Sequence, residues 1–142
     1  YPMTQRTSGP NNDPVREYLR RSGAPYSVVT QGLRGLVENW ERVVEQVIAG
    51  YNLGLDDYLN DMDARQLLAN ALELAPDEFR QAFLPRVPDA DLRIRLDLVP
   101  AGRCLWGGIV AGEEGWNEER NWWYSERPRN LGPALRRELE ET

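Results

Sequence analysis

The chain has 142 residues, of which 41% are hydrophobic and 28% charged, and its formal net charge is −6. A chain of this length can bury a core without disulfides or metal, and the composition is that of one soluble globular domain. No apolar run approaches the roughly 18 residues of a membrane-spanning helix. Acidic residues outnumber basic ones in both halves of the chain. We therefore expect neither membrane insertion nor the basic surface that binds nucleic acid.

The residue types that are missing restrict the chemistry. The sequence contains no histidine, and all 17 basic residues are arginines. The chain therefore cannot supply imidazole acid–base catalysis, histidine-ligated zinc or a lysine Schiff base. The lone Cys104 fits a reducing cytoplasm and is expected to be a small buried residue, because no histidine is present to activate its thiol. We expect a cytoplasmic protein that is not an enzyme and holds no cofactor.

The chain begins with a stretch rich in Ser, Gly, Pro and Asn over 1–12. This composition predicts a flexible tail ahead of a single globular domain over 13–142. A short helix follows, with Asp13 as its N-cap and Pro14 in its first turn. Ser22–Gly23 is expected to end it, because glycine commonly follows the last turn of a helix.

A longer amphipathic helix begins near Ser27 or Thr30 and ends near Gly50. Trp40 lies in the middle of its apolar stripe, so we expect the ring to pack in the core rather than to contact a ligand. The stripe has steps of three and four residues and comprises Leu33, Leu36, Val37, Trp40, Val43, Val44, Val47 and Ile48.

Three shorter helices are predicted next. The first covers residues 56–61, and Asp61 or Asp63 then caps the second. Pro76 begins the third as a first-turn residue, followed by acidic side chains that suit the helix dipole. The apolar residues of the second helix are Leu67, Leu68, Ala71, Leu72 and Leu74.

Residues 91–110 are ambiguous, because apolar and charged residues alternate from Leu92 to Leu98. Alternation is the strand pattern and suggests a β-hairpin over 92–110. Leucine and arginine are good helix formers, however, and Asp89 can cap a helix. We favour a helix over 89–98, with the hairpin as the alternative.

The C-terminal part is rich in glycine and tryptophan, and we expect it to be irregular until Pro133 begins a short terminal helix. The predicted fold is mainly α: a compact bundle of five to six helices with an irregular Trp-rich segment packed over it. The alternative is an α+β fold that contains the hairpin over 92–110.

Four aspartates crowd one segment, at positions 56, 57, 61 and 63. Oxygen-rich segments bind Ca²⁺ or Mg²⁺, but the glycine and glutamate spacing of an EF-hand is missing here. Helix capping explains these aspartates without an ion, so we predict no metal site.

Four arginines of the C-terminal part, Arg127, Arg129, Arg136 and Arg137, lie near Trp123 and Tyr124 in the sequence. Arginines beside aromatic rings can bind nucleic acid. Neighbouring glutamates largely cancel this charge, and pairs such as Arg136 with Glu140 have the spacing of helical ion pairs. We therefore predict no nucleic-acid partner.

Four of the five tryptophans fall between Trp106 and Trp123, and five charged residues lie between Trp106 and Trp122. Such a segment cannot be wholly buried, and we expect Trp116 to be the exposed ring. Trp122 and Trp123 are adjacent, so an extended backbone would point one of them outward.

Exposed tryptophans beside acidic residues are typical of a surface that docks a basic protein. We therefore expect a non-catalytic interaction module of the immunity-protein, antitoxin, inhibitor or adaptor type. The alternative is a small-molecule-binding protein or small hydrolase with the Trp-rich segment as a pocket lid. The predicted contact residues are Trp116, Trp122, Trp123, Tyr124, Asp56, Asp57 and Asp61.

Overall fold

The computed structural model describes residues 13–141, so the predicted tail at 1–12 and the last residue lie outside the described part. The predicted mainly helical fold with a Trp-rich C-terminal segment is confirmed, although residues 13–141 form seven α-helices rather than five or six. In chain order the elements are α1 (Pro14–Arg21), α2 (Tyr26–Ala49), α3 (Leu55–Leu74), α4 (Asp77–Gln81), α5 (Arg86–Arg95), β1 (Leu98–Pro100), α6 (Gly108–Glu114), the 3₁₀ turn η3 (Trp122–Tyr124), β2 (Glu126–Pro128) and α7 (Pro133–Glu141).

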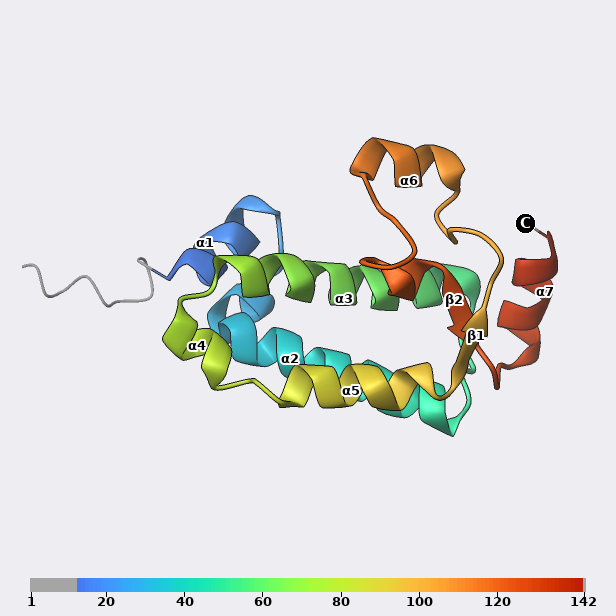
Figure 1. Cartoon of the computed structure of the whole chain (residues 1–142), viewed down its shortest axis with the longest axis horizontal. Coiled ribbons are helices and arrows are strands. Elements are labelled where there is room, and N and C mark those ends of the chain that lie inside the picture. Colours follow the sequence, from blue (N-terminus) through green and yellow to red (C-terminus); the bar gives the residue numbers. More distant parts are fainter. Residues whose placement is uncertain (1–12, 142) are drawn as a thin grey trace, which may run out of the picture.

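Three helices follow the long axis of the molecule (Figure 1). α2 and α3 form an antiparallel pair, and α5 packs along α2. α1 packs on α2 and α3 at one end, and α7 packs on α3 at the other. Arg65 is the one charged side chain among the buried residues of the described chain. Within residues 13–141, none of the helices combines the length and apolar character needed to cross a membrane.

The first helix begins where the sequence predicts it. Pro14 is the first residue of α1, and the Asp13 carboxylate accepts hydrogen bonds from the main-chain N–H groups of Val15 and Arg16 at 2.9 and 3.3 Å. These bonds satisfy two of the N–H groups that a helix start leaves without partners. The predicted cap is therefore confirmed.

The predicted stripe of α2 is buried, except that Ile48 is half-buried. The helix begins at Tyr26, close to the predicted start, and Gly50 follows its last residue. It is interrupted at Gly32, whose φ of 60° lies in the left-handed region. A Cβ at this position would lie 3.1 Å from Nε of Arg16. Glycine is needed here both for its backbone angle and for the close approach of α1.

Residues 55–74 form one continuous helix, so the prediction of two helices with a cap at Asp61 or Asp63 is wrong. Both aspartates lie inside α3, where the main-chain N–H groups are already hydrogen-bonded. Their carboxylates accept hydrogen bonds from Tyr51 and Tyr124 instead, each at 2.6 Å. Tyrosines from outside the helix thus replace the main-chain partners that a cap would have required.

The ambiguous stretch is a helix followed by a short strand. α5 confirms a helix here, although it covers Arg86–Arg95 rather than the predicted 89–98, and the alternative hairpin over 92–110 is wrong. β1 pairs antiparallel with β2, with Leu98 opposite Pro128, rather than with the residues that follow it. Residues 108–114, which we expected to be irregular, form α6.

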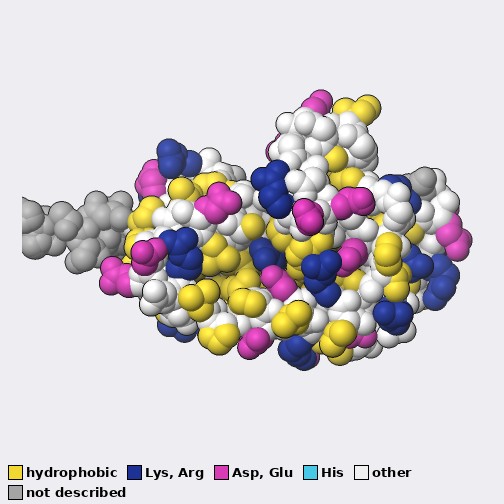
Figure 2. Space-filling view, in the orientation of Figure 1, with side chains coloured by type: hydrophobic (Ala, Val, Ile, Leu, Met, Phe, Trp, Pro, Cys, Tyr) yellow, Lys and Arg dark blue, Asp and Glu magenta, His cyan; other side chains and the backbone are white. Residues whose placement is uncertain are grey.

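The strand-like alternation arises because this part of the chain is apolar on two opposite faces. Ile94 and Leu98 are buried, whereas Leu92 and Leu96 are 67% and 76% exposed. Leu92 and Leu96 are four residues apart and therefore share the outward face. Figure 2 shows apolar side chains exposed over α4 and α5.

We expect Trp40→Ala to lower the free energy of unfolding by about 3–5 kcal/mol, because emptying a buried aromatic site removes apolar contacts and leaves a cavity. The Trp40 side chain is fully buried, and its Nε1 donates a hydrogen bond to Asp91 at 2.9 Å. Urea-induced unfolding measures the change. A loss below about 1 kcal/mol would contradict the central place of this ring in the core.

The two faces of α5 should respond differently to truncation. Ile94→Ala should lower the free energy of unfolding by about 2–5 kcal/mol, whereas Leu92→Ala should change it by about 0.5 kcal/mol or less. The same urea titration compares the two variants. Equal losses of unfolding free energy would contradict the assignment of Leu92 to the exposed face of α5.

Candidate functional site

Trp122 and Trp123 both lie in the core, so the expectation that one of them points outward is wrong. Their residues form a 3₁₀ turn rather than an extended segment. Successive side chains of such a turn are about 120° apart rather than on opposite sides. Both rings therefore contact the helices, and Trp122 is 7% and Trp123 3% exposed. The two rings meet edge to face, with centroids 5.3 Å apart.

A buried arginine, Arg65 of α3, lies over the Trp123 ring at 4.4 Å from its centroid. Its guanidinium donates to both oxygens of Asp91 in α5, at 3.0 and 2.8 Å. Trp40 of α2 donates to the same carboxylate. Arg65 was not among the residues predicted from the sequence, although it lies on the same face of α3 as the buried Tyr58, Met62 and Leu68. The signal that could have revealed its burial is a charged residue at a position of α3 where the helical spacing predicts an apolar one.

A second aromatic group lies beside this cluster. The Tyr124 hydroxyl donates to Asp63, and Trp116 is half-buried and stacks on the Tyr124 ring at 4.1 Å between centroids. Trp106 donates from Nε1 to the same Asp63 oxygen at 3.0 Å and is 40% exposed. The exposed ring of the segment is therefore Trp106, and the prediction of Trp116 is wrong. Cys104, expected to be buried, is half-buried against the core.

The predicted acidic contacts separate into two environments. Asp56 and Asp57 lie in the exposed first turn of α3, where carboxylates favour the helix dipole. Asp61 is half-buried and engaged with Tyr51. Among residues 13–141, no three carboxylate or thiol side chains are arranged to hold a metal ion. Of the predicted contact residues, the structure exposes Asp56 and Asp57, half-buries Asp61 and Trp116, and buries the other three, Trp122, Trp123 and Tyr124.

The segment between the exposed ring and η3 stands away from the helices (Figure 1). We call residues 106–120 the α6 projection. α6 contributes no buried residue, and Ile109 is 79% exposed. Gly107 and Gly115, with φ of 101° and 75°, allow the chain to turn sharply at both ends of this short helix. Figure 2 shows apolar and acidic side chains on the projection. Its exposed charged residues are Glu113, Glu114, Glu118, Glu119 and Arg120.

We expect Asp61→Asn to gain stability relative to the wild type as the pH rises from about 3 to about 7. Burial raises the pKa of Asp61, and the hydrogen bond from Tyr51 offsets only part of this effect. A carboxyl whose pKa is raised by folding makes the wild type less stable as pH rises through the folded pKa. Asparagine keeps an acceptor for Tyr51 without the buried charge. Urea unfolding at both pH values measures the difference.

Glu41→Gln is a control variant whose stability relative to the wild type should change with pH in the opposite direction. Hydrogen bonds from Arg86, at 3.0 and 2.6 Å, lower the pKa of Glu41. The stability that Glu41 contributes is present above its unfolded pKa and is lost as pH falls through its folded pKa. Relative to the wild type, this variant should therefore lose stability as pH rises. The same sign for both variants would contradict the assignment of Asp61 to a buried site.

Comparisons with known proteins do not assign this geometry to a family. No protein-family model matches the chain, and neither a curated protein nor a solved structure matches it.

Proposed function

We propose that the chain is a non-catalytic protein-binding module whose α6 projection docks a basic partner, in the manner of an immunity protein, antitoxin, inhibitor or adaptor. The supporting observation is that Trp106 and Ile109 are exposed on a segment whose helix contributes nothing to the core. Apolar side chains that gather on the surface are typical of binding sites. Aromatic anchors among them supply much of the binding energy at protein interfaces.

The Trp106 ring is held in place before any partner arrives. Its Nε1 is hydrogen-bonded to Asp63, and Asp63 is itself held by the Tyr124 hydroxyl. At the other end of the projection, Trp116 stacks on Tyr124. A side chain that is already ordered loses less conformational entropy on binding, which favours affinity. The contacts to α3 and η3 thus support a rigid anchor.

The charge of the projection favours a basic partner. Four exposed glutamates flank the apolar side chains, against the single Arg120. Acidic groups around an apolar contact accelerate association with a basic surface and repel acidic surfaces. Asp56 and Asp57 are exposed and stay predicted contacts, whereas Asp61 is turned toward Tyr51.

We expect Trp106→Ala to weaken partner binding by about 2 kcal/mol or more, which is about 30-fold in affinity. Partners are captured from an extract of the source organism with tagged protein and identified, and one is purified. Calorimetric titration then measures its affinity for the wild type and the variant. Urea unfolding checks that the variant remains folded, because an exposed ring should contribute little to the core.

Leu92→Ala is the matched control, since it removes an exposed apolar side chain from a different face. It should leave the affinity unchanged. Replacing Glu113, Glu114, Glu118 and Glu119 with glutamine should slow association at low salt and have less effect at high salt. A partner that binds the Trp106 variant as tightly as the wild type would exclude the α6 projection as the docking surface.

A further inference from the structure

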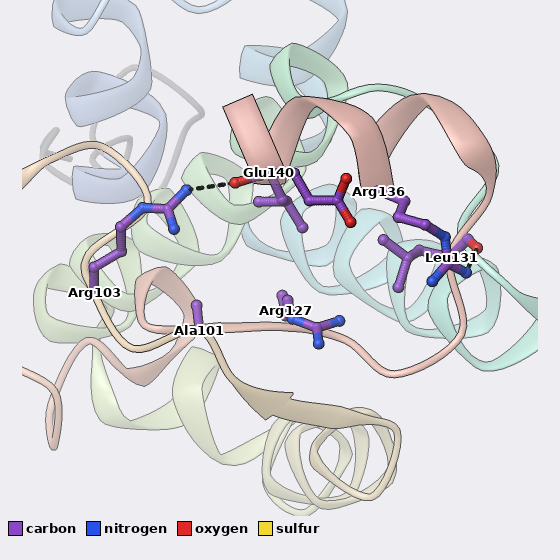
Figure 3. Close-up of a pocket in the computed structure, with 7 residues that line it drawn as sticks. Ala101, Arg103, Arg127, Leu131, Arg136 and Glu140 are labelled. Carbon is purple, nitrogen blue, oxygen red and sulfur yellow. Dashed lines mark hydrogen bonds between the residues drawn. The ribbon is translucent and has the colours of Figure 1, made fainter. Parts of the chain in front are cut away.

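A small pocket lies between α7 and the segments that contain β2 and the loop after β1 (Figure 3). Its volume is about 200 Å³. Three arginines from these separate segments line it, together with the apolar side chains of Ala101, Leu131 and Leu139. The arginines are Arg103, Arg127 and Arg136, and the one carboxylate of the lining is Glu140.

The guanidinium groups are positioned by main-chain oxygens. Arg127 donates from Nη1 to the carbonyl of Pro128 at 3.1 Å, and Arg136 donates from Nη2 to that of Leu131 at 3.3 Å. Arg103 donates from Nη2 to the Leu139 carbonyl at 3.5 Å, the dashed line in Figure 3. Carbonyls orient a guanidinium without neutralising its charge. Each guanidinium carries five N–H donors, so one such bond leaves Arg127 and Arg136 with donors for a ligand.

The ion pair predicted between Arg136 and Glu140 is not formed. Within residues 13–141, neither Arg136 nor Arg127 has a carboxylate oxygen within 4.0 Å, whereas the neighbouring Arg137 pairs with Glu141 at that distance. Three guanidinium groups and one carboxylate give the lining a net charge of +2, in a chain whose net charge is −6. Within residues 13–141, Arg127 and Arg136 are therefore two pocket arginines whose charge is not paired with a carboxylate.

We propose that this pocket binds a phosphate group, either as free inorganic phosphate or as the end of a small phosphate monoester. Guanidinium groups match the oxygens of phosphate with paired hydrogen bonds. A phosphate dianion could accept hydrogen bonds from both Arg127 and Arg136, which have no carboxylate partner within residues 13–141. The volume is below the roughly 300–1,000 Å³ of drug-sized ligand pockets, so one anionic group fits better than a whole nucleotide. The site is independent of the α6 projection and does not rest on the proposed docking function.

Only the folded chain brings these three arginines together, so a bound anion should stabilise the fold. The test uses the full chain with inorganic phosphate, phenyl phosphate or acetate, each compared with sodium chloride at equal ionic strength. Phosphate at saturation should raise the melting temperature by about 4 °C over chloride, and titration calorimetry should show one site. Stabilisation by phenyl phosphate as well would identify the monoester as an accepted form. Stabilisation by acetate alone would overturn the assignment to phosphate.

Variants of the lining residues distinguish specific binding in the pocket from general screening of charge by salt. Arg127→Gln and Arg136→Gln should each weaken phosphate binding at least tenfold, whereas Glu140→Gln should tighten it by removing the one negative charge of the lining. Arg137→Gln is the matched control, because Arg137 lies beside Arg136 on α7 but does not line the pocket. Melting in chloride checks that each variant is folded. The proposal fails if phosphate stabilises no more than chloride, or if the Arg137 variant loses as much affinity as the Arg136 variant.

Discussion

The carboxylate of Asp91 is the contact on which the arrangement of the helices depends. It lies on α5 and accepts hydrogen bonds from Trp40 of α2 and from the guanidinium of Arg65 in α3. A buried charge is costly unless it is paired and hydrogen-bonded, and removing one partner of such a pair costs about 3–5 kcal/mol. The three long helices are thus joined at one point where each supplies a group that the others need.

Arginines of α3 and α5 hold two tryptophans of the Trp-rich segment, Trp122 and Trp123, in the core. Arg65 presents its face to Trp123, and Arg95 covers Trp122 in the same way, at 4.4 and 4.5 Å from the ring centroids. Two residues before Arg65 on α3, Asp63 accepts hydrogen bonds from the Tyr124 hydroxyl and from Trp106 Nε1. These polar groups hold the returning chain against α3. The part between these anchors is excluded from the core, and it forms the projection that we assign to binding.

The two proposed surfaces have opposite local charge in one acidic chain. The α6 projection carries four exposed glutamates, whereas the pocket beneath α7 is lined by three arginines. At physiological ionic strength, charges separated by more than about 8 Å are largely screened from one another. Each surface is therefore recognised by its own side chains. The net charge of −6 disfavours binding of a nucleic acid, but it does not prevent one anionic group from binding in the arginine-lined pocket.

Features that depend on neighbouring residues could be predicted from the amino-acid sequence. The Asp13 cap, the buried stripe around Trp40 and the terminal helix at Pro133 follow from local hydrogen bonds and from the helical period. The partner of each polar or aromatic side chain, in contrast, depends on how distant segments pack together. Asp61 and Asp63 accept hydrogen bonds from tyrosines rather than capping a helix. Arg65 is buried and paired with a carboxylate 26 residues away, and Trp106 rather than Trp116 is exposed. These outcomes depend on contacts between distant segments, whose free energies outweigh the local preferences that a sequence pattern reports.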